Sequence, residues 1–289
     1  MANKKWFSPS NNISVNGAIH LPGDKSIGIR SIIILSQSYG ISNVHNVSSG
    51  EDVQTAISAI RKLKVQILKI SPNQYQIFGL GIGFKKFKGT INFNNSGTTL
   101  RLLTGLLATS EVDVKLIGDL SLSKRPLRII SLMENFFATF NPKNKNYLPI
   151  KISGYPDSIQ SELVVNKPSA QMVSACILAG MNSHGITTIK APNLQRDHTE
   201  LMLKYLKYPI KVQNKKNSKI IKIRGKQFLK AEKNYLVPGD PSSAAFLIVL
   251  ALLSNNSNLS LPNVLLNPKR IGFLNVLKKM GGLIKILNK

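Results

Sequence analysis

Apolar residues recur along the chain in two patterns, one typical of buried helices and one typical of short strands. Runs of apolar residues several positions long follow turns that are rich in Pro, Gly, Asn and Ser, whereas shorter alternating runs precede those turns. The expected helices cover Ser31–Leu35, Val53–Leu63, Leu100–Leu107, Met172–Met181, Leu201–Tyr208 and Ala244–Leu253. The expected strands cover Ile13–Ile19, Val65–Ile70, Gln74–Phe78, Gly89–Phe93, Val112–Ile117, Ile150–Ile152, Glu162–Val165, Ile186–Ile189, Lys219–Ile223 and Tyr235–Val237. Repetition of strand, turn and helix predicts an α/β fold made of repeated units.

The turns before the helices resemble one another. Pro22–Gly23–Asp24 and Pro238–Gly239–Asp240 are the same tripeptide, and each is followed by a Ser two residues later and by an apolar helix. A helix start binds anions because its free N–H groups and its macrodipole favour negative charge. Lys25 and Arg30 follow the first turn, so several such starts could meet at one anionic ligand. Repeated helix capping without any ligand explains the pattern equally well.

The net charge of +26 permits two interpretations, nucleic-acid binding and a compositional bias toward lysine. Of the 39 basic residues only eight are arginines, and six of those lie in or beside the motif-like stretches, whereas the lysines are scattered. Compositional bias is favoured, because no known nucleic-acid-binding module is recognisable. The one candidate patch for nucleic acid is Lys204–Lys233, with Tyr205 and Tyr208.

Length and composition indicate one large or two medium globular domains. No stretch reaches the roughly 20 apolar residues of a membrane span, and the first residues lack the apolar core of a secretory signal. Cys176 is the single cysteine, which excludes a disulfide framework and a cysteine metal cluster, and the four histidines show no ligand spacing. We therefore expect a cytoplasmic protein without a membrane partner or a metal.

Seven stretches follow one another in a recognisable order along nearly the whole chain: Pro22–Ser26 with Arg30, Asn95–Thr98, Leu122–Pro126, Ser169–Gln171, Arg196–Glu200, Val237–Phe246, and Asn267–Pro268 with Arg270 and Gly272. Taken together, these stretches resemble the 5-enolpyruvylshikimate-3-phosphate (EPSP) synthase family. The resemblance implies two similar domains, each an inside-out arrangement of three β-α-β-α-β-β units, with substrates between them. Residues 20–237 would form one complete domain, and 1–19 with 238–289 part of the second.

The resemblance also implies a transferase of the shikimate pathway, which leads to chorismate and the aromatic amino acids. The 5-hydroxyl of shikimate 3-phosphate attacks C2 of phosphoenolpyruvate (PEP), C3 is protonated, and phosphate then leaves. The family's reaction calls for no metal or redox cofactor. Both substrates are polyanions, in keeping with repeated helix starts and basic side chains.

Residue roles follow from the resemblance by position. Lys25 would be catalytic, by contacting both substrates and stabilising charge near the reacting carbon. Shikimate 3-phosphate is expected on Lys25, Ser26, Arg30, Ser169 and Gln171, with Arg30 binding through its fork, and PEP on Lys25, Gly97, Arg125 and Gln171. Secondary candidates are Ala170, Asn95, Thr98, Arg128 and Arg196. Asp240 is expected to cap a helix and His198 to be structural.

The chain departs from the family pattern at four positions. Gly28 and Ile29 stand where the family has Ser and His, Asn94 where Gly is usual, and Gln195 where Ser is usual. The sequence also ends at Lys289, ahead of the family's segment with an acidic base and a late PEP-binding arginine.

We therefore expect the chain alone to catalyse poorly or not at all, to expose apolar faces over Ala244–Leu253 and Ile271–Ile286, and to depend on a complementing C-terminal fragment. Two alternatives are a degraded, non-catalytic remnant and, less favoured, a basic nucleic-acid-binding protein.

Overall fold

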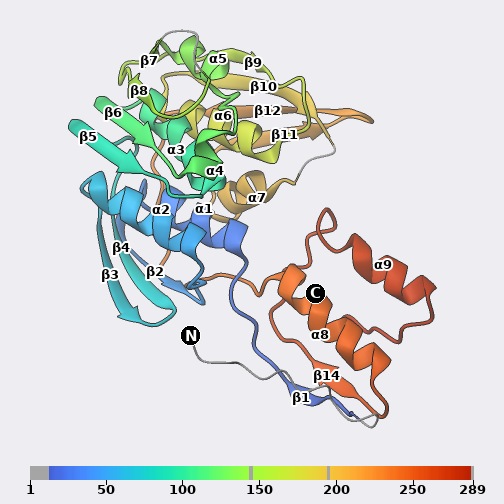
Figure 1. Cartoon of the computed structure of the whole chain (residues 1–289). Coiled ribbons are helices and arrows are strands. Elements are labelled where there is room, and N and C mark those ends of the chain that lie inside the picture. Colours follow the sequence, from blue (N-terminus) through green and yellow to red (C-terminus); the bar gives the residue numbers. More distant parts are fainter. Residues whose placement is uncertain (1–12, 143–145, 194–195, 288–289) are drawn as a thin grey trace. The chain divides into compact units, whose positions relative to one another are not determined.

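The computed structural model describes residues 13–142, 146–193 and 196–287 (Figure 1). The chain divides into a larger unit, Lys25–Val237, and a smaller unit made of Met1–Asp24 and Pro238–Lys289. The chain therefore passes between the units twice. The first passage follows Asp24, a few residues beyond the position expected from the sequence.

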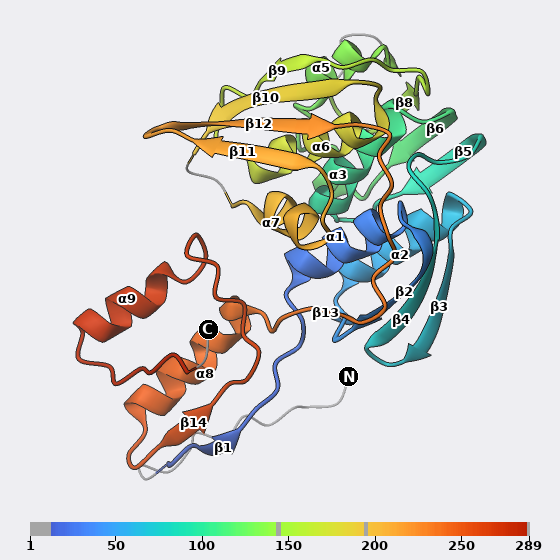
Figure 2. The same cartoon turned by 180° about the vertical axis from the view of Figure 1, so that it is seen from behind.

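The larger unit contains three four-stranded sheets with the same internal plan, seen from behind in Figure 2. In each sheet an edge strand pairs in parallel with its neighbour, and the two remaining strands pair antiparallel. The first sheet has the strand order β13 (Tyr235–Leu236), β2 (Tyr39–His45), β4 (Gln74–Leu80), β3 (Gln66–Ser71). The second sheet has the order β5 (Phe87–Asn92), β6 (Val112–Ile117), β8 (Ile150–Ser153), β7 (Thr139–Asn141). The third sheet has the order β9 (Glu162–Val164), β10 (Ile186–Pro192), β12 (Ser218–Arg224), β11 (Ile210–Asn214). Three equal sheets confirm the prediction of repeated β-α-β-α-β-β units.

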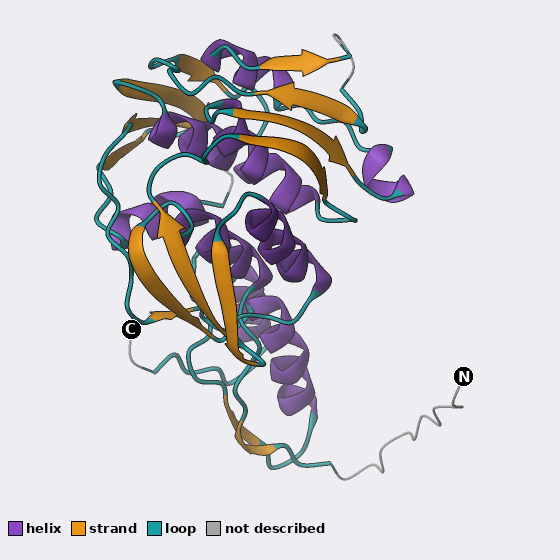
Figure 3. Cartoon of the chain, turned by 90° about the vertical axis from the view of Figure 1, so that its left-hand side faces the viewer, coloured by secondary structure: helices purple, strands orange, loops and turns teal. Residues whose placement is uncertain are grey.

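Helices fill the interior of the larger unit and the sheets lie around them (Figure 3). Each repeat contributes one buried helix, which directly precedes the second strand of its sheet, β2, β6 or β10. These are α1 (Lys25–Leu35), α3 (Gly97–Ala108) and α6 (Ala170–Asn182). The other helical segments are α2 (Glu51–Lys62), α4 (Leu120–Ser123), α5 (Ile130–Met133), the 3-10 turn η1 (Glu134–Phe136) and α7 (His198–Tyr205).

The three inner helices are mostly apolar and are buried on nearly all sides, which is why they form the core rather than a surface. In α1 every residue from Ile27 to Leu35 is buried. The helices α3 and α6 approach closely at Gly105, where an added Cβ would lie 2.2 Å from the carbonyl oxygen of Ala175. A side chain at Gly105 would push the two backbones apart, so the sequence itself sets this spacing.

The outer helix α2 has the opposite character. Glu51 and Asp52 occupy its first turn and Arg61 and Lys62 its last, which is the charge order that the helix macrodipole favours. Its buried positions, among them Val53 and Ile60, recur with helical spacing. The helix therefore packs one face on the core and leaves its charged start exposed.

The smaller unit contains β1 (Asn16–Ala18) and β14 (Asn258–Ser260), which pair in parallel, and the helices α8 (Pro241–Leu253) and α9 (Gly272–Lys279). Asp240 caps α8 by accepting from the N–H of Ser242, as expected. Arg270 joins the two Pro-Gly-Asp copies, since its guanidinium donates to Asp24 at 2.9 Å and to Asp240 at 3.3 Å. The two copies of the tripeptide are thus held together at the start of α8.

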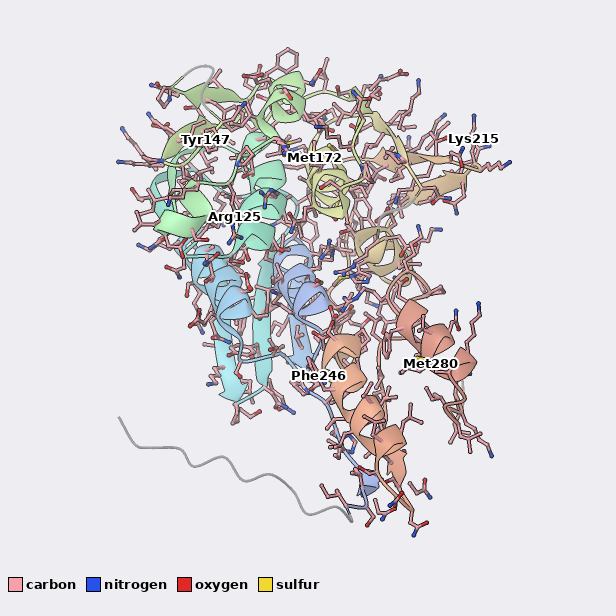
Figure 4. All side chains as sticks on the ribbon, turned by 45° about the vertical axis from the view of Figure 1, so that its right-hand side comes forward. Arg125, Tyr147, Met172, Lys215, Phe246 and Met280 are labelled. Atoms are coloured by element: carbon pink, nitrogen blue, oxygen red, sulfur yellow. The ribbon has the colours of Figure 1, made fainter. Side chains whose placement is uncertain are left out.

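The apolar faces expected in the smaller unit are exposed (Figure 4). In α8 the side chains of Phe246 and Leu253 are 80% and 82% exposed, and in α9 and beyond Met280 and Leu283 are 77% and 95% exposed. Only Pro241 and Ala244 of α8 are buried. The described part of the chain therefore leaves this long apolar helix without the cover that such a sequence normally has.

Some expected elements are shifted and others were missed. The expected helix Leu201–Tyr208 begins at His198 and ends at Tyr205, because the polar stretch before Leu201 is already helical. The strand β2 was not predicted, since Ser42 points inward and Gly40 has a φ of 104°, which hides the alternation. Within the described ranges, none of the helices is both long and apolar enough to cross a membrane.

Candidate functional site

A cavity of about 390 Å³ in the larger unit collects the first residues of four helices. The helices α1, α2, α3 and α6 each contribute their first or second residue to its wall. The lining residues are Lys25, Glu51, Asp52, Asn95, Gly97, Thr98, Arg101, Arg125 and Gln171. Helix starts present N–H groups and positive dipole ends, so the cavity is suited to an anion.

Three cations line this cavity, and among the residues that the structure describes only Lys25 has a carboxylate partner there. Lys25 lies 2.9 Å from Asp52, with both side chains partly exposed. Arg125, on the loop that follows α4 and labelled in Figure 4, donates to the side-chain oxygens of Asn95 and Ser121, each at 2.9 Å. Among the described residues, Arg101 and Arg125 form no ion pair, so positive charge remains available for a ligand.

The side chain of Gln171 spans the cavity wall between two helices. Its Nε2 donates to the hydroxyl of Thr98 at 2.8 Å, and its Oε1 accepts from Arg101 at 3.2 Å. Burial lowers the pKa of Arg101, and the neighbouring charges of Arg125 and Arg128 lower it further. An arginine stays protonated at neutral pH even so. The lowered pKa means that burial disfavours the charged form of Arg101 when no anion lies nearby.

Six of the residues predicted from the sequence lie together in this wall, namely Lys25, Asn95, Gly97, Thr98, Arg125 and Gln171. The other six, Ser26, Arg30, Ser169, Ala170, Arg128 and Arg196, do not line the cavity. Ser169 accepts from the N–H of Met172 and is the N-cap of α6, which explains why a serine begins this helix. Its place beside Gln171 in the chain keeps it at the same helix start.

Arg30 is buried, and its guanidinium is directed into the protein. Its three nitrogens donate to Thr199 at 2.8 Å, to the carbonyl oxygen of Ser26 at 3.0 Å and to Ser174 at 3.0 Å. Ser174 and Thr199 also bond to each other at 2.7 Å. Arg30 therefore connects α1, α6 and α7. The resemblance had instead led us to expect that its guanidinium contacts shikimate 3-phosphate directly.

A buried ion pair lies at the end of the stretch Arg196–Glu200, next to Thr199. Glu200, in α7, pairs with Lys219, in β12, and the two side chains are 4% and 1% exposed. His198 is buried at the start of α7, consistent with a structural role. The stretch Arg196–Glu200 thus joins α7 to the core through Thr199 and Glu200.

The candidate nucleic-acid patch is reduced by burial. Tyr208 is buried, and its hydroxyl donates to the carbonyl oxygen of Met181. Burial also raises its pKa to about 12. Lys219 is buried as well. Neither side chain can therefore make the contact with a nucleic acid that the candidate patch would require. Lys215, at the tip of the β11–β12 turn, is exposed (Figure 4).

A second cavity of about 440 Å³ lies beside α2 and is lined by hydroxyls, amides and the carboxylates of Glu51 and Asp52. Asn94 lines it and donates to Thr55 at 3.2 Å. Its φ is 46°, a conformation that glycine or asparagine adopts most readily, which explains why Asn can replace the usual Gly.

Two other departures from the family pattern, Gly28 and Ile29, do not line either cavity. Ile29 is fully buried in α1, so an imidazole at this position would lie in the core. A Cβ at Gly28 would meet Val53 at 3.6 Å, an ordinary contact. Gln195 lies outside the described residues. Among those residues, no group of three or more His, Cys, Asp and Glu side chains is placed to hold a metal ion.

Sequence reasoning missed three residues of the wall, Glu51, Asp52 and Arg101. The two acids lie in the first turn of α2, where their charge favours the start of a helix. Arg101 follows Gly97 by one helical turn, a spacing that places both on one face of α3. That spacing was the available signal for Arg101.

Fold and cavity together define a class of α/β protein with repeated units and a cavity wall of helix starts that is suited to an anion. The model of the EPSP synthase (3-phosphoshikimate 1-carboxyvinyltransferase) family matches residues 10–288. The chain belongs to the EPSP synthase family.

Similar proteins include the 3-phosphoshikimate 1-carboxyvinyltransferases of Zymomonas mobilis and Petrotoga mobilis, each 40% identical. The matches cover 95% and 98% of this chain and 61% and 65% of those proteins. The solved EPSP synthase of Acinetobacter baumannii superposes with a TM-score of 0.85 at 34% identity, covering 93% of this chain and 60% of that one. The chain thus spans less than two thirds of the length of these relatives.

Proposed function

We propose that this chain binds shikimate 3-phosphate and PEP and takes part in transfer of the enolpyruvyl group to the 5-hydroxyl of shikimate 3-phosphate, with release of phosphate. The observation that carries the proposal is the cavity at four helix starts, with Lys25, Arg101 and Arg125 in its wall. Both substrates carry phosphate and carboxylate groups, which such a wall attracts.

In this proposal Lys25 contacts both substrates and stabilises the charge that develops at the reacting carbon. Arg125 binds PEP through its fork, and Gln171 bridges the two ligands. Gly97 gives PEP access to the start of α3. Asn95 and Thr98 complete the PEP side of the wall by holding Arg125 and Gln171 through the contacts described above.

Shikimate 3-phosphate is proposed to lie toward the starts of α1 and α6, on Ser26 and Ser169, with Ala170 beside them. Arg30 supports Ser26 through its carbonyl oxygen and acts on this ligand indirectly. Arg128 and Arg196 are exposed and add positive charge around the site. The compartment proposed for the reaction is the cytoplasm, on the basis of the cysteine content.

We also propose that catalysis needs a complementing C-terminal segment. Support comes from the chain's coverage of less than two thirds of its relatives and from the exposed apolar faces of α8 and α9. A general base contributes roughly 10²–10⁴-fold to the rate of a proton-transfer step, so a base supplied by a complementing segment would raise turnover by that order.

The test is an assay of phosphate release from shikimate 3-phosphate and PEP. It compares this chain alone, this chain with the remaining C-terminal segment of the Zymomonas mobilis relative, and that segment alone. We expect binding of shikimate 3-phosphate without turnover by the chain alone, and turnover only in the mixture. Rapid turnover by the chain alone would refute the need for a complementing segment. Absence of both binding and complementation would refute the catalytic proposal and favour a non-catalytic remnant.

A further inference from the structure

Arg101 connects three segments of the cavity wall through one guanidinium. Its Nη1 donates to the carbonyl oxygen of Gly97 at 3.1 Å and to Oε1 of Gln171 at 3.2 Å. Its Nη2 lies 3.5 Å from the carbonyl oxygen of Pro126, in the loop that carries Arg125. A planar fork can serve several acceptors in fixed directions, which a lysine cannot do.

These contacts determine how the amide of Gln171 is oriented. Its oxygen faces Arg101, an obligatory donor, and one N–H is used by Thr98. A reversed amide would turn its NH₂ group toward the guanidinium and lose the Arg101 contact. The second N–H of Gln171 is therefore the group left for a ligand in the cavity.

Gly97 lies against the same guanidinium. A Cβ added at this glycine would lie 2.7 Å from Nη1 of Arg101, closer than real Cβ contacts come. Gly97 does not have a positive φ, so backbone conformation does not explain the glycine. The space that a side chain would need is occupied by Arg101.

The contacts of Arg101 are unusual for a cation whose role is only structural. All the acceptors described above for Arg101 are neutral, and no carboxylate among the described residues pairs with it. A partly buried cation without an anionic partner costs stability. The wall therefore holds a charge that a ligand anion would offset.

We infer that Arg101 is a positioning residue that orients the amide of Gln171, and that a methyl group at position 97 would displace the Arg101 guanidinium in addition to narrowing the access of PEP to the start of α3. The ligand-binding consequence rests on the proposed function, whereas the orientation of Gln171 does not. No group of the ligand needs to touch Gly97 for a substitution there to weaken binding.

The first test measures the side-chain amide resonances of Gln171 in the full, unliganded chain by NMR, assigned through their loss in Gln171→Leu. Gly97→Ala and Arg101→Lys should both shift these resonances. The matched control is Gly28→Ala, in another inner helix, where the added methyl makes only an ordinary contact. Unchanged Gln171 resonances in both test variants would overturn the inference.

The second test measures binding of shikimate 3-phosphate by calorimetry. Gly97→Ala and Arg101→Lys should each weaken binding by roughly tenfold, and the double variant should be no weaker than the stronger single loss, because both act through one contact. Full binding by Arg101→Lys would show that charge alone suffices and would overturn the positioning role. Additive losses would show that Gly97→Ala acts independently of Arg101 and would overturn the inferred displacement of the guanidinium.

The two tests separate the failures. If the unchanged chain does not bind shikimate 3-phosphate, the proposed function fails, and the Gln171 resonances still decide the role of Arg101. Cooperative unfolding within a few degrees of the unchanged chain confirms that each variant is folded. Gly97→Ala is expected to fold normally, because the displaced atom is the end of a flexible side chain.

Discussion

Removal of one partner from the buried Lys219–Glu200 pair should destabilise the larger unit strongly. Both side chains are almost completely buried, so Lys219→Met leaves a carboxylate without a cation inside the protein. Breaking such a pair from one side typically costs about 3–5 kcal/mol. Replacing both partners, as in Lys219→Met with Glu200→Leu, removes both charges and should recover most of that loss.

Cys176 supplies a readout specific to the larger unit. It is the single cysteine and is fully buried in α6, so a brief pulse of a thiol reagent labels only unfolded molecules. With a urea slope of about 2 kcal/mol per M, the single variant should shift the labelling midpoint down by roughly 1.5–2.5 M.

The control is Lys190→Met on the neighbouring strand β10. Lys190 lies 3.9 Å from Glu162, and both of their side chains are more than half exposed. The change should stay within about 0.5 kcal/mol. Equal losses in the Lys219→Met single and double variants would show that packing, and not the unpaired charge, causes the destabilisation.

Three further outcomes are expected. Asp52→Asn removes a negative charge 2.9 Å from Lys25 while keeping an acceptor, so titration with inorganic phosphate should show roughly two- to fivefold tighter binding; weaker binding would mean that the carboxylate holds Lys25 in place. Burial raises the pKa of Cys176 to about 12, so its thiolate is fully populated only above that pH, and at pH 8 alkylation without urea should be negligible by mass spectrometry; rapid labelling would contradict the burial. Phe246→Ser with Leu253→Gln should reduce self-association of the chain in light scattering, because these side chains are largely exposed, and an unchanged particle size would refute this.

Local chemistry made much of the larger unit predictable. The turn residues before Gly97 and Ala170 predicted two of the buried helices, α3 and α6. The strand Val112–Ile117 was predicted with its observed bounds. These signals depend on neighbours in the sequence, since caps, turns and alternation are short-range features. The family resemblance added the three repeats and six of the nine residues of the cavity wall.

Long-range contacts were beyond this reasoning. Arg101 meets Gln171 seventy residues later in the chain, and nothing near either residue indicates their pairing. The inward direction of Arg30 likewise depends on Thr199, which lies in a different repeat. A motif can therefore locate a helix start correctly and still mislead about where a long side chain points.

The pairing of β13 with β2 has a consequence for biosynthesis. The first sheet begins at Tyr39 but takes its edge strand from Tyr235–Leu236, nearly two hundred residues later. While the ribosome is still adding residues, the emerging chain can close the second and third sheets in turn, yet the first must wait with its edge unpaired. Completion of the larger unit is thus a late event of translation, and a nascent chain halted before Tyr235 would present an open sheet edge to chaperones or to other chains.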